Sequence, residues 1–228
     1  IFNRRWSAAF KELLYASRVR STANIVAALA KTPTGKCLVN ASAVGYYGPT
    51  GAEELTETSP AGTDFLARLC VDWEKATAPA AAQGIRTVVL RTGVVLDPHG
   101  GALQKMMTPF KMFVGGPIGS GKQFVSWIHH QDMVGLILCA LDNDLAAGPL
   151  NAAAPGAVTN KVFSTALGRA LHRPSLMPTP GFMLRVALGP VAGVITTGQR
   201  VVPKKALDLG YKFKFAEIDA ALQDIVSN

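Results

Sequence analysis

The sequence predicts an α/β protein built on a parallel β-sheet. Two apolar runs, Cys37 to Ala41 and Arg86 to Leu96, have the character of buried strands, and helical segments precede and follow them. Strands that alternate with helices usually pair in parallel, because each helix returns the chain across the sheet. The 228 residues, 49% hydrophobic and 17% charged, suffice for one domain with a small additional lobe.

The first half of the chain is expected to alternate long helices with short strands. Between Ser7 and Leu29 the apolar residues are spaced by three or four, which predicts a helix with a break marked by Ser21-Thr22. The elements expected next are a turn at 31–35, the strand 37–41, a loop over 46–60, a helix capped by Thr63 or Asp64 that runs to Gln83, and the strand 86–96.

The second half shows the same alternation and then changes character. Prolines at positions 174, 178 and 180 indicate a boundary to a smaller carboxy-terminal lobe, so we divide the chain into residues 1–155 and 156–228. The elements expected in this second half are helix 102–113, a glycine loop over 115–122, strand 123–129, helix 132–142 with Asp132 as N-cap, strand 148–153, a helix capped by Thr159 or Asn160, and helices 183–197 and 216–226.

Charge and cysteine content narrow the function classes. The net charge of +8 is spread along the chain, whereas nucleic-acid-binding proteins concentrate their basic residues, so we expect anionic small ligands and no nucleic acid. Cys37, Cys70 and Cys139 lie in separate apolar runs, which indicates free thiols in a reducing compartment, either the cytoplasm or an organelle. The apolar stretch from Phe182 to Thr196 is too short and too interrupted to span a membrane.

Several motifs occur in an order that resembles a known family. They are Arg5-Trp6, Ser17-Arg18, Ser42-Ala-Val-Gly-Tyr-Tyr-Gly48, Asp72-Trp-Glu74, Leu90-Arg-Thr-Gly-Val-Val-Leu96, Gly115-Gly-Pro-Ile-Gly-Ser-Gly121, Ser126-Trp-Ile-His129, Asn151, His172-Arg-Pro174 and Gly198-Gln-Arg-Val-Val-Pro203. Together they resemble the epimerase-like branch of the extended short-chain dehydrogenase/reductases. The resemblance implies a Rossmann-type, NAD(P)-binding parallel sheet with a small substrate lobe.

One part of the family pattern is not found in the sequence. Family members begin with a strand, a glycine-rich turn and a helix, in which backbone amides approach the cofactor pyrophosphate. The segment from Ser7 to Leu29 resembles the fourth helix of the family, so we expect the first strands of the sheet to be missing from this sequence and the record to be truncated.

The resemblance implies a cofactor and a set of site residues. The cofactor is expected to be NADP, with NAD as the alternative, and Arg18 is expected to lie beside its phosphates. Ser42 and Ala43 are expected to bind the cofactor, and the segment Thr92, Gly93, Val94 and Val95 is expected to line the nicotinamide side, with Gly93 allowing close approach of the ring.

The catalytic positions depart from the pattern. Family enzymes use a Tyr-x-x-x-Lys pair, in which the lysine lowers the pKa of the tyrosine. Those positions hold Phe65 and Leu69, neither of which carries a transferable proton. The remaining candidates for proton transfer are Ser42, Tyr46 and Tyr47, although wall residues are the simpler interpretation of the two tyrosines.

Three other patterns favour structural roles. Gly116 to Lys122 imitates a phosphate loop, but Gln123 replaces the hydroxyl residue and a strand follows. His129-His130 has no third ligand at suitable spacing, so no metal is expected. Asp72 and Glu74 are two apart on a helix, do not share a face and are expected to be solvated.

Two functions therefore remain open. The first is an NADP-binding oxidoreductase or epimerase that acts on an unknown small molecule. The second is a non-catalytic subunit of a larger assembly, in which bound nucleotide only adds stability. For a protein partner, the basic and apolar region from Phe182 to Lys205 is the expected contact surface.

Overall fold

A three-stranded parallel sheet forms the centre of the protein. The computed structural model describes residues 6–31, 36–189 and 192–227. Strands β1 (Cys37–Ala43), β3 (Arg86–Thr92) and β7 (Gly148–Ala152) lie side by side in that order, all parallel. This confirms the predicted α/β class. Because Ala43, Thr92 and Ala152 are in register, the three carboxyl ends lie at one edge of the sheet.

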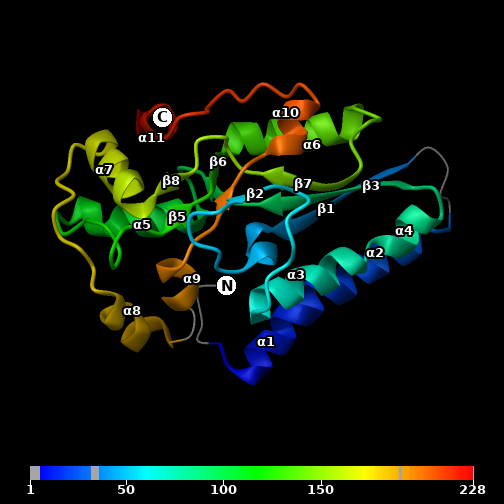
Figure 1. Ribbon diagram of the computed structural model, residues 1–228, viewed down its shortest axis with the longest axis horizontal. Coiled ribbons are helices and arrows are strands. Elements are labelled where there is room, and N and C mark those ends of the chain that lie inside the picture. The colour runs from blue at the N-terminus through cyan, green and yellow to red at the C-terminus, as the bar shows by residue number, and fades with distance from the viewer. Residues whose placement is uncertain (1–5, 32–35, 190–191, 228) are drawn as a thin grey trace.

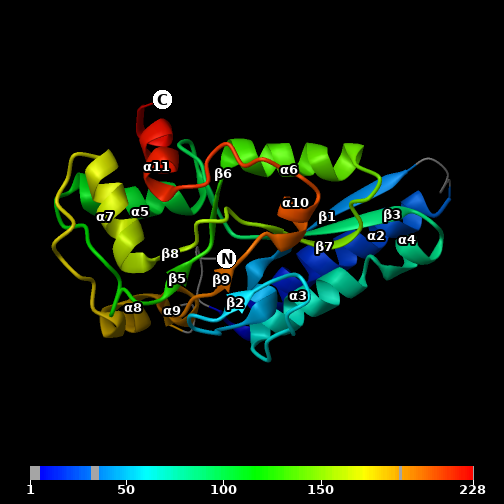
Figure 2. The same cartoon turned by 45° about the horizontal axis from the view of Figure 1, so that its top comes forward.

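Helix α6 (His130–Asp142) covers one face of this sheet (Figures 1 and 2). Its inward residues Leu136 and Ala140 are fully buried and pack against Val88 and Leu90 of β3. Burial of a large apolar side chain such as that of Leu136 contributes about 1.5–3 kcal/mol to the stability of the folded state. The helix is therefore held by apolar packing and not by intrinsic propensity.

The opposite face is covered by an amino-terminal helical run and by two shorter helices (Figure 1). The run consists of α1 (Ala8–Tyr15), the π-helical turn η1 (Ala16–Arg20) and α2 (Ser21–Leu29). The helix predicted over this segment is confirmed, but a π-helical turn before Ser21 takes the place of the expected break. The helix predicted to reach Gln83 ends earlier and continues as a second one: α3 (Phe65–Lys75) and α4 (Ala78–Ala82).

The strand predicted over 86–96 divides at Gly93. Its last part, β4 (Val94–Leu96), leaves the central sheet and pairs in parallel with β6 (Trp127–His129). The strand predicted over 123–129 divides in the same way at Ser126, with β5 (Phe124–Val125) pairing with β8 (Val158–Thr159). An alternating pattern cannot show such a division, because the apolar residues continue through both parts.

A small lobe packs on β4 and β6. Its helices are α5 (Gly101–Lys111), α7 (Asn160–Ala170) and α11 (Ile218–Ser227) (Figure 2). They share one apolar core with the fully buried Trp127. The indole Nε1 of Trp127 donates to the carbonyl oxygen of Gly156 at 2.8 Å, so its polar group is satisfied inside the core. The lobe thus has its own apolar centre.

The remaining elements connect the two parts. The helix predicted over 183–197 is found as two short helices, with residues 190–191 outside the described part, as is most of the turn predicted at 31–35. These elements are η2 (Val44–Tyr47), β2 (Glu54–Leu55), α8 (Gly181–Leu188), α9 (Ala192–Thr196), β9 (Arg200–Val201), which pairs with β2, and α10 (Lys204–Asp208). No helix in the described part is both long and apolar enough to cross a bilayer.

The predicted role of Asp132 as an N-cap is wrong. Helix α6 begins at His130, and the side chain of His129 accepts the capping hydrogen bond from the backbone N–H of Gln131 at 3.2 Å. The carboxylate of Asp132 is buried and accepts hydrogen bonds from the backbone N–H groups of Lys214 and Phe215 at 2.8 and 2.9 Å. Asp132 therefore fixes the segment that leads into α11.

Replacing this carboxylate tests how strongly it anchors the carboxy-terminal segment. Asp132→Ala leaves two backbone donors without their acceptor, so we expect a loss of about 2–4 kcal/mol in the free energy of unfolding. Urea unfolding measures this loss. Asp142→Ala, at the exposed end of the same helix, is the matched control and should change stability by less than about 0.5 kcal/mol. Equal effects of the two variants would contradict the anchoring role.

Candidate functional site

The predicted site residues meet at the carboxyl edge of the sheet. Ser42 and Ala43 end β1, and Thr92 to Val95 span the end of β3 and the start of β4. Ala43 and Thr92 are register partners, so the two groups are direct neighbours. Ala43 and the segment 92–95 are half-buried, so they remain partly accessible at the edge where ligands of open α/β sheets bind.

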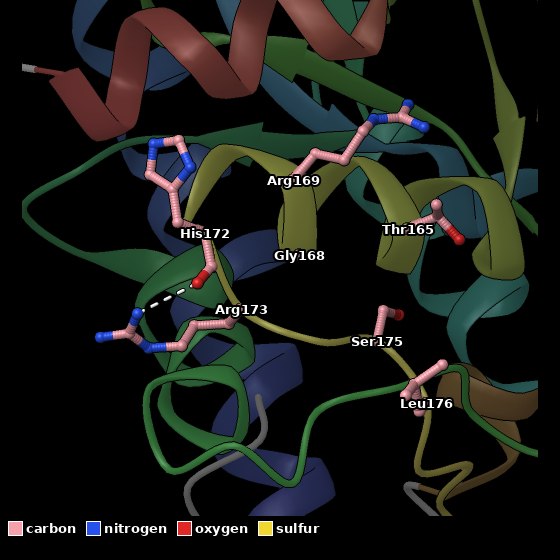
Figure 3. Close-up of a pocket in the computed structure, with 7 residues that line it drawn as sticks. All are labelled: Thr165, Gly168, Arg169, His172, Arg173, Ser175 and Leu176. Atoms are coloured by element: carbon pink, nitrogen blue, oxygen red, sulfur yellow. Dashed lines mark hydrogen bonds between the residues drawn. The ribbon is translucent and has the colours of Figure 1, made fainter.

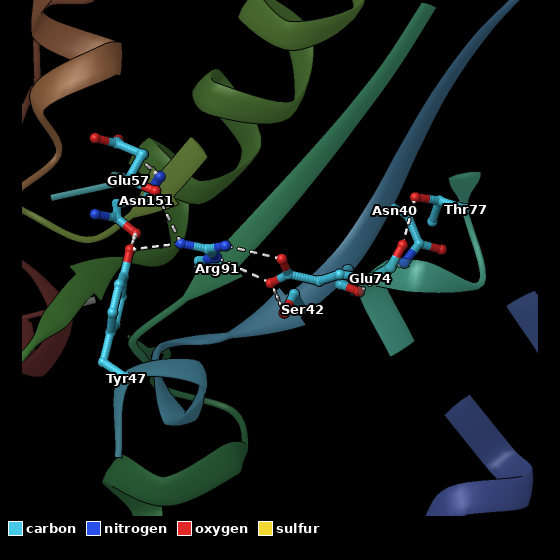
Figure 4. A network of polar contacts seen from close by, with 9 residues as sticks. Asn40, Ser42, Tyr47, Glu57, Glu74, Thr77, Arg91 and Asn151 are labelled. Carbon is cyan, nitrogen blue, oxygen red and sulfur yellow. Dashed lines mark hydrogen bonds and ion pairs between the residues drawn. The ribbon is translucent and has the colours of Figure 1, made fainter. Parts of the chain in front are cut away.

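A buried ion pair lies directly beneath this edge. The guanidinium of Arg91 donates from Nε to Oε1 of Glu74 and from Nη2 to Oε2, both at 2.9 Å (Figure 4). The side chains are only 4% and 14% exposed. Although burial would lower the pKa of Arg91, the hydrogen bonds to Glu74 and Tyr47 raise it, so the guanidinium remains charged.

The remaining donor atom of Arg91 extends this network to β7. Its Nη1 donates to the hydroxyl of Tyr47 and to the carbonyl oxygen of Glu57, both at 3.1 Å. The hydroxyl of Tyr47 donates in turn to Oδ1 of Asn151 at 2.6 Å. Burial raises the pKa of Tyr47, so this phenol is neutral at neutral pH. Tyr47, 1% exposed, is thus fixed inside the protein.

The carboxylate of Glu57 closes the network from the loop before α3. Its Oε1 accepts hydrogen bonds from the backbone N–H groups of Asn151 at 3.0 Å and Lys205 at 3.2 Å. The side-chain amide of Asn151 donates to the carbonyl oxygen of Val202 at 2.9 Å. Polar groups from six separate segments therefore satisfy one another, as buried polar groups must.

Ser42 belongs to the same network. Its hydroxyl donates to Oε1 of Glu74 at 2.7 Å, and only 4% of the residue is exposed. Next to it lies Cys70, whose pKa burial raises to about 11 and which contacts the Ser42 side chain and the Ala43 backbone. The geometry gives Ser42 a partner within the protein and turns its hydroxyl away from the accessible surface.

Arg18 lies in the π-helical turn η1, close to this end of β1. Its Nη1 donates to the carbonyl oxygen of Leu14 at 3.3 Å and to Oγ of Ser17 at 3.0 Å, and its guanidinium carbon lies 5.5 Å from the ring centre of Trp73. Its charge also acts on the thiol of Cys70. Arg18 thus lies beside α3, whose Cys70 contacts Ser42 and Ala43.

Tyr46 differs from its neighbour. It is half-buried, and the guanidinium carbon of Arg91 lies 3.4 Å from its ring centre, a cation–π contact. The ring also meets Tyr47 edge-to-face at 5.3 Å. Its hydroxyl has no hydrogen bond to another residue in the described part of the chain. Among the predicted catalytic residues, Tyr46 has its ring fixed and its hydroxyl available.

The two residues at the positions of the Tyr-x-x-x-Lys pair pack against other side chains. Phe65, the first residue of α3, contacts Trp6 edge-to-face at 5.5 Å, and the ammonium group of Lys11 lies 4.9 Å from its ring centre. Leu69, one turn later, is 4% exposed. Both side chains therefore contribute to the contact between α3 and its surroundings.

The structure explains the glycine at position 93 by a close backbone contact that the sequence did not predict. A Cβ atom at this position would lie 2.6 Å from the carbonyl oxygen of Ser126. The two backbone segments cross here, because the N–H of Val94 donates to the carbonyl oxygen of Ser126 at 2.8 Å. This crossing alone requires glycine at position 93. Close approach of a nicotinamide ring at this residue stays a prediction.

Sequence reasoning missed the residue at the centre of the network, Arg91. The sequence did contain a signal for it: a charged residue inside an apolar strand needs a partner of opposite charge or a hydrogen-bond acceptor. The expectation that Asp72 and Glu74 are a solvated pair is wrong for Glu74, because its partner comes from β3, outside its own helix.

The two other structural interpretations are consistent with the described residues. In the glycine loop, Ile118 N–H and Gly119 N–H donate to Asn160 and Thr179, so they are not directed at a phosphate. His129 is fully buried and stacks on Phe215 at 3.9 Å. Within the described ranges, no three His, Cys, Asp or Glu side chains are grouped as a metal site.

Family models match two parts of the chain. Residues 1–153 match the NAD dependent epimerase/dehydratase family, and residues 179–225 match a domain of unknown function, DUF1731. An epimerase family protein of Mycobacterium bovis is 44% identical over 223 residues, covering 97% of this chain and 74% of the relative. The chloroplastic SDR39U1 homolog of Arabidopsis thaliana is 42% identical, covering 97% and 65%.

Two crystal structures are similar over almost the whole chain. Human epimerase family protein SDR39U1, solved with NADPH, has a TM-score of 0.95 and 38% identity, covering 100% of this chain and 79% of the human one. The nucleoside-diphosphate sugar epimerase from Corynebacterium glutamicum has a TM-score of 0.80 and 32% identity, covering 98% and 44%.

The buried ion pair generates a stability prediction. Glu74→Gln leaves the charge of Arg91 without its counter-ion, so we expect a loss of about 3–5 kcal/mol in the free energy of unfolding. Denaturant unfolding measures it. The exposed pair of Arg20 and Glu12 offers a matched control, since both side chains are more than half exposed and Glu12→Gln should cost less than about 1 kcal/mol. A loss at position 74 as small as at position 12 would refute the central role of the pair.

Proposed function

The chain belongs to the NAD dependent epimerase/dehydratase family, and on this premise we propose that it binds NADP(H) and supports an oxidoreductase or epimerase reaction. The observation that carries the proposal is the similarity over its full length to human SDR39U1, which was solved with NADPH. NAD is the alternative cofactor. The substrate is a small molecule that reaches the carboxyl edge of β1 and β3.

The described residues fit the nicotinamide end of the cofactor. The partly accessible Ala43 and segment 92–95 lie at the edge where dinucleotides bind in such sheets. The charge of Arg18 acts on Cys70, which contacts Ser42 and Ala43, and its guanidinium suits phosphate oxygens. The described part of the chain holds no glycine-rich turn for the pyrophosphate, so the fit concerns this end alone.

When bound, the cofactor would supply or accept the hydride. The chain's part would be to hold and to move a proton, and we assign this task to the hydroxyl of Tyr46. The guanidinium of Arg91 fixes the ring of Tyr46 from one face, and the Glu74 carboxylate fixes Arg91. We assign Ser42 and Tyr47 to positioning, since both hydroxyl groups have partners inside the network.

A second function is a non-catalytic subunit of a larger assembly. It is favoured by the apolar side chains of Phe65 and Leu69 at the usual proton-relay positions and by the engagement of Ser42 and Tyr47 in structural contacts. In that case the bound dinucleotide would stabilise the native state by mass action. The two functions agree on cofactor binding and differ in whether substrate is turned over.

Cofactor binding is tested by titrating the protein with NADPH and NADH while following nicotinamide fluorescence. We expect tighter binding of NADPH, and we expect Arg18→Ala to weaken it by about tenfold to a hundredfold, the cost of one charge-assisted contact. Arg20→Ala, on the same helical run but with an exposed side chain, is the matched control and should bind normally. Binding of neither nucleotide would remove the cofactor proposal.

The role of Tyr46 is tested with Tyr46→Phe. This variant keeps the ring and its contact with Arg91, so folding and NADPH affinity should be unchanged, while turnover should fall by about 10²–10⁴-fold. Consumption of NADPH against a panel of nucleoside-diphosphate sugars and small carbonyl compounds provides the measurement. Tyr15→Phe on α1 should retain full activity. Undiminished turnover in Tyr46→Phe would exclude Tyr46 as the acid, and an absence of turnover in the parent protein would favour the subunit function.

A further inference from the structure

The charges of the protein are divided between its two parts. The segments 98–131 and 145–207, which contain α5, α7, α8 and α9, hold no aspartate or glutamate. All 15 acidic residues lie in the rest of the chain. The basic residues of the acid-free segments are Lys105, Lys111, Lys122, Lys161, Arg169, Arg173, Arg185, Arg200, Lys204 and Lys205. These acid-free segments therefore account for the positive net charge of the protein.

Ion pairs with carboxylates are found in the described part at three of these basic residues. Arg169 pairs with Asp219, Arg200 with Glu54 and Lys204 with Asp208. No ion pair involving Lys111, Lys122, Lys161 or Arg173 occurs within the described ranges. The outer side of the small lobe thus carries uncompensated positive charge.

An exposed apolar cluster lies beside two of these cations, since Lys111 directly precedes it in the chain and Arg173 contacts the ring of Phe113. It consists of Met112, Phe113 and Val114 after α5 and of Leu176 and Met177 after α7, and we call it the apolar tip. These side chains are between 45% and 82% exposed. The two loops are joined, because Met177 N–H donates to the carbonyl oxygen of Gly115 at 3.2 Å. Contiguous exposed apolar side chains are unusual unless they contact something.

The backbone of Phe113 is held in an unusual conformation. Its φ angle is 63°, in the left-handed region that bulky residues avoid. The side chain is nevertheless 58% exposed, and the guanidinium of Arg173 lies 4.5 Å from its ring centre. The left-handed backbone of Phe113 thus leaves more than half of the residue exposed, with the Arg173 cation beside its ring.

A pocket of about 560 Å³ adjoins the apolar tip. Figure 3 shows Arg173 and Leu176 on the loop that follows α7, with Arg169 on the helix itself. The pocket is lined by Thr165, Gly168, Arg169, His172, Arg173, Ser175 and Leu176. Nε of Arg173 and Oγ of Ser175 are buried without a hydrogen-bond partner in the described part. The lining contains hydrogen-bond donors and cations and no carboxylate.

We propose that the small lobe docks on an anionic phospholipid bilayer, with the apolar tip inserted among the headgroups and the basic residues around it facing lipid phosphates. Membrane-surface binding combines these two terms: buried apolar side chains and attraction of Lys and Arg to anionic lipid. An acidic protein would satisfy the charge. It would not by itself account for apolar side chains that project from two loop ends with cations beside them.

Co-sedimentation with vesicles of phosphatidylcholine, with and without about 30% phosphatidylglycerol, tests the proposal. We expect binding to the anionic vesicles, little binding to the neutral ones, and weaker binding as salt rises from about 50 to about 300 mM. Phe113→Ser should lower the partition coefficient by about tenfold through lost apolar contact, and Lys111→Glu by about tenfold or more through charge.

The matched control is Lys31→Glu, which makes the same charge change at an exposed residue two positions after the end of α2. Helix α2 lies on the other side of the molecule from α5 and α7 (Figure 1). The Lys31→Glu variant should bind vesicles like the parent protein. In addition, Phe113→Trp should show blue-shifted emission with anionic vesicles and quenching by brominated lipid. A loss in Lys31→Glu as large as in Lys111→Glu, or unchanged binding of Phe113→Ser, would overturn docking through the apolar tip. So would binding to an acidic polypeptide together with none to vesicles.

Discussion

The structure depends on the charge of Arg91. A guanidinium at the end of the central strand cannot remain buried without compensation, and its three nitrogen atoms reach three separate segments: α3 through Glu74, η2 through Tyr47 and the following loop through Glu57. The same cation holds the ring of Tyr46. The paired charge of Arg91 therefore fixes the sheet edge, the covering helix and the candidate site. Loss of any one partner leaves the remaining buried polar groups incompletely hydrogen-bonded, which destabilises the folded state.

Two other buried carboxylates accept hydrogen bonds from backbone N–H groups. Glu57 and Asp132 each accept two backbone N–H groups from segments far away in the sequence. Glu57 joins the start of α10 to β7, and Asp132 joins the segment before α11 to α6. Irregular segments cannot satisfy their own backbone donors, so buried acceptors of this kind determine where the connections run. They are the polar counterpart of the apolar cores.

The sequence predicted what local patterns encode. The parallel sheet, the helical run before β1 and the apolar side chains of Phe65 and Leu69 followed from periodicity and from family resemblance. The division of strands at Gly93 and Ser126 was not predictable, because it results from a backbone crossing between distant segments. Glu74 and Asp132 were misjudged for the same reason: their partners come from other elements. Contacts at long sequence distance decide which polar residues are buried.

The small lobe is assembled from three separate stretches of chain. Helices α5, α7 and α11 share one apolar core, but α6 and the sheet strand β7 lie between the first two along the sequence. The lobe cannot become complete before the polypeptide has crossed the sheet and returned, which raises the mean sequence separation of its contacts and slows folding. It also means that one proteolytic cut cannot release the lobe as an independent fragment, and both parts should melt together in one cooperative transition.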